Sequence, residues 1–177
     1  MVARTDLVTD PQILEDLLLA RRGTAFFSRT LRELRDAELS GASRVPGWSR
    51  AHVVAHVGYH ARALARIVEG VRTGRSLPMD DSDQERDEEV ELGSTLPGVA
   101  LRNLHSHAAV HLNVEWRDLE AERWSHLIAL DGGHVVPVSE TPRLRAREVW
   151  LGAVDLGAGA SMDDLPDGVM DRAAAVS

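Results

Sequence analysis

The strongest helical pattern in the chain lies in residues 49–70, which read SRAHVVAHVGYHARALARIVEG. The Val, Leu and Ile residues of this segment repeat every three or four positions, the spacing of one helix face. Ser49 precedes the pattern and is a favoured N-cap residue, and Gly74 follows it as a helix stop. The sequence therefore predicts a long helix over about residues 50–72 that packs one side against a core.

The same periodicity recurs on both sides of this segment. It predicts three further helices, over about residues 11–38, 96–119 and 142–156. Residues 124–140 instead alternate with a period of two around Asp131-Gly132-Gly133, which indicates a β-hairpin. We therefore expect an all-α fold, an antiparallel four-helix bundle with a small β-hairpin inserted before the fourth long helix.

Length and composition are those of one globular domain. The chain has 177 residues, of which 44% are hydrophobic and 27% charged, and this composition excludes an intrinsically disordered protein. We expect the bundle to occupy residues 1–160. Residues 161–177 are then a short C-terminal segment, either a remnant or the start of a further domain.

The net charge and the absence of Cys restrict the partners that the protein can bind and the chemistry that its own side chains can perform. With 20 basic and 28 acidic residues, the net charge of −8 argues against nucleic acid or an anionic membrane surface as the main partner. The chain has no Cys, so disulfides, thiolate metal ligands and a cysteine nucleophile are excluded, and a reacting thiol has to come from a cofactor. No apolar run resembles a signal peptide or a membrane span, and we expect a cytoplasmic protein.

An acidic segment connects the second and third predicted helices. Residues 80–91 contain eight acidic side chains and one basic side chain, Arg86, for a local charge of −7. Such runs usually stay hydrated, which favours a solvated loop or the exposed start of a helix over a cation-binding patch. Arg86, the lone basic residue among these acids, is the one residue of this segment that stands out.

Three histidines are spaced four residues apart in the segment 49–70. His52, His56 and His60 fall roughly on one helix face, where stacked imidazoles can chelate a metal. His56 lies in the apolar sequence VVAHVG and is therefore the best candidate for an inward-facing polar group.

Glu148 lies in the apolar part of the fourth predicted helix, where a buried carboxylate needs a partner. One interpretation is a partly exposed ion pair with Arg145 or Arg147. The other is that Glu148 and His56 converge in the bundle core, where such bundles hold metals and cofactors.

Other polar and aromatic residues have simpler interpretations. His107 and His111 are four residues apart in the third predicted helix, with His105 nearby, and either form a second chelate or face solvent. His126 and His134 are expected at the surface of the hairpin. We interpret the four tryptophans as packing anchors, because no basic stripe accompanies them.

Two separated motifs resemble those of a known family. They are PGWSRAHVVAHVGYHARAL at residues 46–64 and SETPRLRAREVWLGAVDLG at residues 139–157. Their sequence and order resemble the mycothiol-dependent maleylpyruvate isomerases, which belong to the DinB-like metal-binding bundles. The likeness covers most of residues 10–165, and family members commonly continue into a smaller C-terminal domain.

The resemblance implies a divalent metal, usually zinc, held by three side chains. His56 matches the first ligand and Glu148 the second, whereas Gly152 stands where the family pattern has its third ligand, a histidine. Glycine inside a helix costs about 0.5–1 kcal/mol relative to alanine, so we interpret Gly152 as an empty ligand position. His60, Asp155 or water are conceivable replacements for the missing ligand.

The resemblance also implies an activity, the isomerisation of maleylpyruvate to fumarylpyruvate with mycothiol as the thiol cofactor. Arg86 is then a candidate for binding carboxylates of the substrate or cofactor, because Arg binds carboxylates bidentately. The alternatives are a mycothiol S-transferase acting on another electrophile, and a metal-free enzyme or binding protein. The expected partners are a small-molecule substrate and a low-molecular-weight thiol, in a monomer or homodimer.

Overall fold

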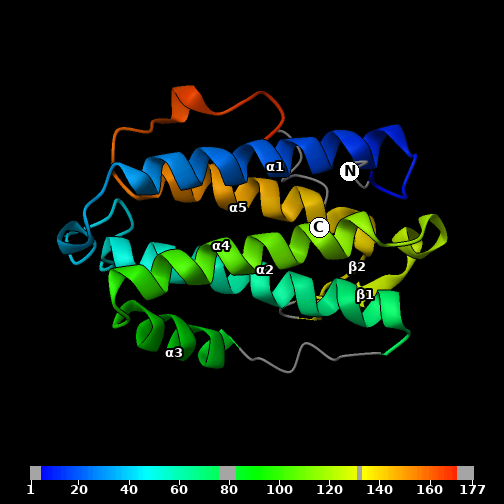
Figure 1. Ribbon diagram of the computed structural model, residues 1–177, viewed down its shortest axis with the longest axis horizontal. Coiled ribbons are helices and arrows are strands. Elements are labelled where there is room, and N and C mark those ends of the chain that lie inside the picture. Colours follow the sequence, from blue (N-terminus) through cyan, green and yellow to red (C-terminus); the bar gives the residue numbers. More distant parts are fainter. Residues whose placement is uncertain (1–4, 76–82, 131–132, 171–177) are drawn as a thin grey trace.

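The computed structural model describes residues 5–75, 83–130 and 133–170. Within these ranges the chain forms five α-helices and one two-stranded sheet (Figure 1). The helices are α1 (Pro11–Arg32), α2 (Arg50–Thr73), α3 (Asp83–Ser94), α4 (Gly98–Arg117) and α5 (Thr141–Asp155). In the described part of the chain, no helix is long and apolar enough to cross a membrane.

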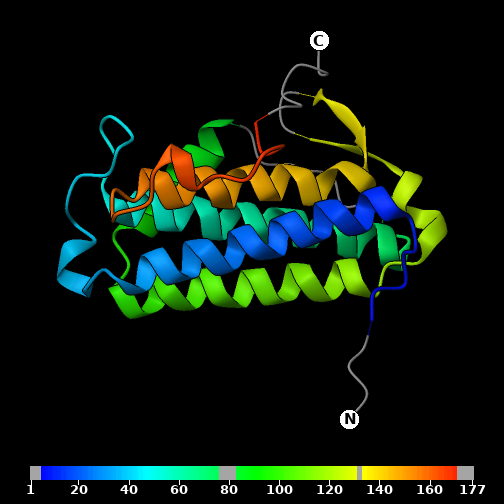
Figure 2. The same cartoon turned by 90° about the horizontal axis from the view of Figure 1, so that it is seen from above.

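The four longer helices form the expected bundle. α1 packs along α5, α2 packs along α4, and α2 also contacts α5. Figure 2 shows the four helices running side by side, with the hairpin at one end of the bundle. The predicted four-helix bundle with a hairpin before its last helix is confirmed. In Figure 1, α1 and α5 run in one direction and α2 and α4 run in the opposite direction, so the helices are antiparallel between these two pairs and parallel within each pair. The division of the chain at residue 160 stays a prediction.

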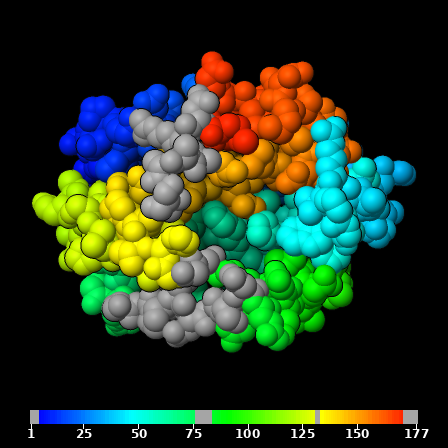
Figure 3. Space-filling model, turned by 180° about the vertical axis from the view of Figure 1, so that it is seen from behind, coloured from blue at the N-terminus to red at the C-terminus, as the bar shows by residue number. Residues whose placement is uncertain are grey.

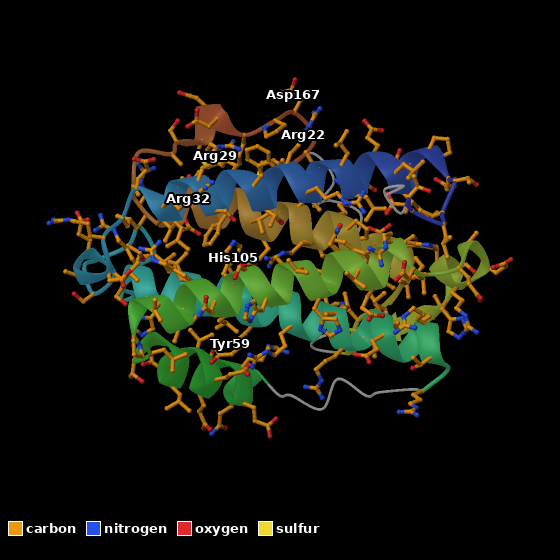
Figure 4. All side chains as sticks on the ribbon, in the orientation of Figure 1. Arg22, Arg29, Arg32, Tyr59, His105 and Asp167 are labelled. Carbon is orange, nitrogen blue, oxygen red and sulfur yellow. The ribbon has the colours of Figure 1, made fainter. Side chains whose placement is uncertain are left out.

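The acidic segment forms a fifth helix, α3, in addition to the four long helices that the sequence predicts. Of the two interpretations of residues 80–91, the exposed helix is right from Asp83 onward, and residues 80–82 lie outside the described residues. Val90 anchors α3 because its side chain is buried. At Gly93 an added Cβ atom would lie 2.6 Å from the ring of Tyr59, which points from α2 toward α3 (Figure 4). A glycine at this position lets the two helices approach closely.

The first helix is shorter than the predicted range 11–38. α1 ends at Arg32, and a separate 3₁₀ turn follows at Asp36–Glu38. The backbone of Arg35 is extended, and its N–H donates to the Glu38 carboxylate at 2.8 Å. This local hydrogen bond begins a new turn in a different direction, an arrangement that helical periodicity does not reveal.

The hairpin consists of β1 (Leu127–Ala129) and β2 (Val135–Pro137), which pair in antiparallel register with Ile128 opposite Val136. The Ile128 side chain is buried, so this strand residue packs the hairpin against the core of the bundle. His126 and His134 are exposed, as predicted for the hairpin surface. Asp131 and Gly132, which indicated the turn, lie outside the described residues.

A histidine lies in the core between α4 and α1. His105 is 3% exposed, and it projects toward α1 (Figure 4), where its Nε2 atom lies 2.8 Å from the Ser28 hydroxyl. Its ring also contacts Phe27, with centroids 4.8 Å apart. Burial, with a smaller effect of the Arg145 charge, lowers the pKa of His105 to about 4. The ring is therefore neutral in the folded protein at neutral pH.

This pKa shift makes stability depend on pH. The unfolded chain takes up a proton on His105 near pH 6.5 and the folded chain only near pH 4, so acid favours the unfolded state between these values. The free energy of unfolding should fall by about 2 kcal/mol from this group alone between about pH 7.5 and pH 5. Urea unfolding of wild type and His105→Gln at both pH values measures the difference, and equal pH dependence in the two proteins would refute it.

Candidate functional site

The three histidines of α2 point to different partners. Ser49 caps α2, and its backbone N–H donates to His52 Nδ1 at 3.2 Å, while His52 Nε2 lies 3.3 Å from a carboxylate oxygen of Glu91 on α3. His60 turns inward, with Nδ1 3.4 Å from a guanidinium nitrogen of Arg145. A spacing of four residues rotates successive side chains by about 40°, and the three rings therefore do not form one chelate.

His56 and Glu148 are brought together, from α2 and α5. His56 Nε2 lies 3.1 Å from Glu148 Oε1, with 44% of the histidine side chain and 21% of the glutamate side chain exposed. The pair therefore faces solvent on one side and is not enclosed in the core. Viewed from the side opposite to Figure 1, the surface is hollowed over α2, between α5, α3 and the loop around residues 41–48 (Figure 3).

Electrostatics shift the pKa values of both residues of this pair. The hydrogen bond with Glu148 raises the pKa of His56 above its ordinary value, and it outweighs the opposing effect of burial. Burial alone would raise the pKa of Glu148, but the hydrogen bond from His56 and the charges of His60, His56 and Arg145 outweigh burial and lower it. Glu148 is therefore a carboxylate at neutral pH that stabilises a proton on His56.

An aromatic side chain and an acidic helix border the pair. The Trp48 ring lies 5.3 Å from the His56 ring and 6.0 Å from the His52 ring, centroid to centroid. Trp48, interpreted above as a packing anchor, thus packs on the histidines of the site. The charge of Asp87, on α3, also acts on His56. Arg86 is half-buried on the same helix, one residue before Asp87, which is a rotation of about 100° around the helix axis.

The sequence did not indicate that the side chain of Arg145 is buried. One interpretation made Arg145 a partly exposed partner of Glu148, but its guanidinium instead donates to the Val57 carbonyl oxygen at 2.7 Å. Arg147 is exposed. Among the described ion pairs Glu148 meets His56 and neither arginine. The first of the two interpretations of Glu148 is therefore wrong. The convergence with His56 is right, but the pair lies at a partly exposed position and not within the bundle core.

Gly152 is not an empty position. A Cβ atom added there would lie 2.8 Å from Val57 Cγ2 and 3.3 Å from Phe27 Cε2, so side chains of α2 and α1 fill the space. The glycine lets α5 pack against these helices, which corrects its interpretation as an unfilled ligand site. Close packing accounts for the residue despite the cost of glycine within a helix.

We expect Gly152→Ala to destabilise the protein by about 1–3 kcal/mol, because the added methyl group overpacks the contact with Val57. Thermal unfolding of wild type, the single variants and the double variant Val57→Ala/Gly152→Ala measures this effect. The double variant should recover part of the loss, because a smaller residue 57 makes room for the methyl group. Strict additivity of the two single changes would contradict the assigned contact.

Among the described residues, the donor set around His56 and Glu148 lacks the third ligand of a three-ligand zinc site. Gly152 supplies no ligand, and in the described part of the chain neither His60 nor Asp155 joins the pair in a group of three donors. Two side-chain ligands do not fit the three that a catalytic zinc usually keeps. The binding of a metal by His56 and Glu148 stays a prediction.

Comparisons with known proteins identify the relatives of this chain. Two solved structures match it with 44% sequence identity and a TM-score of 0.85. In both cases the matched region covers 89% of this chain and 65% of the other chain. They are the mycothiol-dependent maleylpyruvate isomerase and a histidine-to-alanine mutant of it. The chain thus spans about two thirds of the length of these relatives. No match was found among curated proteins.

A family model places the chain in the same group. The model of the mycothiol maleylpyruvate isomerase N-terminal domain matches residues 20–157, which include α2, α5 and the His56–Glu148 pair. The match covers most of the chain and agrees with the two motifs and with the helical fold. The chain belongs to the mycothiol maleylpyruvate isomerase N-terminal domain family.

Proposed function

We propose that this protein catalyses mycothiol-dependent cis–trans isomerisation of maleylpyruvate to fumarylpyruvate. The observation that carries the proposal is the partly exposed His56–Glu148 pair. It lies in a chain whose sequence is 44% identical to that of a mycothiol-dependent maleylpyruvate isomerase. The chain has no Cys, and an external thiol supplies the sulfur that this chemistry requires. The pair supplies a base to activate that thiol.

His56 accepts the thiol proton in the proposed first step. Its Nε2 atom faces Glu148, so a hydrogen on Nε2 leaves the lone pair on Nδ1 to act as the base. Glu148 orients the ring and stabilises the imidazolium that forms, the role of the third group in a nucleophile–base–acid arrangement. A raised pKa moves His56 toward the range where a general base is most effective at neutral pH.

When bound, mycothiol would supply a nucleophilic sulfur that adds reversibly to the double bond conjugated with the keto group, permits rotation about that bond and leaves without net oxidation. During this cycle His56 would hold the thiol proton and return it to the thiol on release, and Glu148 would stabilise the protonated ring.

The substrate carries two carboxylates, and a cation is needed to hold them. Arg86 on α3 is the proposed group, because a guanidinium binds a carboxylate through two hydrogen bonds. Its position beside Asp87, whose charge reaches His56, places it on the helix that borders the site.

The missing third metal ligand favours a second candidate, a mycothiol S-transferase. Transfer to a stronger electrophile needs the thiolate, but it does not need an enolate to be stabilised by a Lewis acid. The two candidates share His56 and Glu148 and differ in their product.

Product analysis of the purified protein tests the proposal. The protein is incubated with maleylpyruvate, with and without mycothiol, and the products are separated by chromatography. Fumarylpyruvate formed only with both protein and thiol is the expected result. A stable thioether of mycothiol would support the S-transferase instead. Unchanged maleylpyruvate at high protein concentration would contradict the proposed isomerase.

A further inference from the structure

A second group of potential metal ligands lies between α2 and α4, away from the pair described above. It consists of Glu69 on α2 with His111 and Glu115 on α4, called here the Glu69–His111–Glu115 cluster. His111 Nε2 lies 3.5 Å from Glu69 Oε2 and 3.5 Å from Glu115 Oε1. One ligand atom from each of the three residues falls within 4.8 Å of the other two.

These distances suit a shared ion better than direct hydrogen bonds. An N–H···O hydrogen bond is usually about 2.7–3.2 Å long, and both contacts of His111 are longer. In a tetrahedral zinc site with bonds of about 2.0–2.1 Å, two ligand atoms are about 3.3 Å apart. Both contacts of His111 are therefore close to this separation, and the ligand oxygens of the two carboxylates lie within 4.8 Å of each other.

Arg72 holds one member of the cluster in position. Its guanidinium donates to Glu115 Oε2 at 2.6 Å and to Oε1 at 3.3 Å, and Oε1 also lies 3.5 Å from His111 Nε2. Glu115 is 5% exposed, so this arginine fixes a nearly buried carboxylate, as outer-shell partners of metal ligands do. Two carboxylates and one guanidinium give the local group a net charge of −1 when His111 is neutral, which favours a divalent cation.

The cluster is open to solvent and distant from the candidate thiol site. The side chains of Glu69 and His111 are 43% and 44% exposed, so an ion can reach them from solvent. His111 also lines a 530 Å³ pocket between α2 and α4. Glu69 lies 13 residues after His56 on α2, which is about 20 Å along a helix.

We propose that the Glu69–His111–Glu115 cluster binds a divalent transition metal, with zinc as the probe ion. His–x₃–Glu on one helix supplies two ligands, and a glutamate of the neighbouring helix supplies the third, so the ion bridges α2 and α4. This set of one imidazole and two carboxylates meets the three-ligand requirement that the His56–Glu148 pair does not meet. A bound ion stabilises the folded protein, because the unfolded chain does not hold the two helices together.

Zinc titration of the full chain by calorimetry, at neutral pH, tests the proposal. We expect one zinc ion per chain in wild type, with the same affinity in His56→Ala and in His107→Ala. His107 is the matched control, because it lies one turn before His111, lines the same pocket and is outside the cluster. His111→Ala should lose measurable zinc binding, and Glu69→Gln should weaken it at least about tenfold.

Thermal unfolding with zinc provides a second readout. Zinc should raise the unfolding temperature of wild type, His56→Ala and His107→Ala, and should leave that of His111→Ala unchanged. Because the His111 and Glu69 side chains are partly exposed, these variants are expected to fold, and circular dichroism checks this. Zinc binding that survives His111→Ala and is lost in His56→Ala would overturn the proposal, as would the absence of zinc binding in wild type.

Discussion

Replacing His56 by alanine should lower the rate of mycothiol-dependent isomerisation about 10²–10⁴-fold, the usual contribution of a general base. The variant keeps the fold, because the His56 side chain is 44% exposed and fills no core space. Glu148→Gln should give a smaller loss. The amide retains a hydrogen-bond acceptor for His56 but removes the negative charge that stabilises the protonated ring.

His107→Ala is the control for this prediction, since His107 is exposed and outside the site. Initial rates of fumarylpyruvate formation are measured at saturating mycothiol for wild type and the three variants, with folding checked by circular dichroism. A His56→Ala variant with wild-type turnover would remove the base from the proposed mechanism. Equal losses in His56→Ala and His107→Ala would show that the effect is not specific to the site.

The double substitution Val57→Ala/Gly152→His should create a zinc site at the His56–Glu148 pair. Residue 152 lies one helical turn after Glu148 on α5, so a histidine there shares its face and supplies the third ligand. Gly152→His alone should bind weakly or unfold, because its Cβ atom would overlap Val57 Cγ2. Removal of the valine methyl groups relieves the closest contact, and the Phe27 ring, 3.3 Å from the added Cβ atom, has to shift slightly as well.

This gain is measured by zinc calorimetry in the His111→Ala background, so that the Glu69–His111–Glu115 cluster does not contribute. We expect one tightly bound zinc ion in the variant that also carries Val57→Ala and Gly152→His, and much weaker binding in the His111→Ala parent. Zinc binding of equal strength in parent and variant would contradict the position assigned to residue 152.

The fold and the main pair of site residues could be predicted from the sequence because both are encoded locally. Helical periodicity fixed α2 and α5, and the motif match assigned His56 and Glu148. The end of α1 at Arg32 could not be predicted, because it depends on a hydrogen bond between Arg35 and Glu38. Periodicity also does not reveal that a charged segment such as residues 83–94 packs through one valine and one glycine.

The sequence did not predict the roles of residues whose surroundings depend on how two helices pack together. Glu69 became a candidate ligand only when the register of α2 against α4 placed it beside His111. The sequence had suggested His107 as the partner of His111, from spacing along one helix. For Gly152 the sequence suggested an empty ligand position where the structure has none. The neighbours of Gly152 in the sequence do not show that Val57 and Phe27 fill the space beside it.

The ultraviolet absorbance of bound mycothiol reports whether the protein activates the thiol, because a thiolate absorbs where a thiol does not. Mycothiol is titrated into wild type and His56→Ala at neutral pH in the absence of substrate. We expect a thiolate band that saturates near one thiol per chain in wild type and is absent in the variant. Saturated thiol binding without a thiolate band in wild type would contradict the claim that the His56–Glu148 pair activates the thiol.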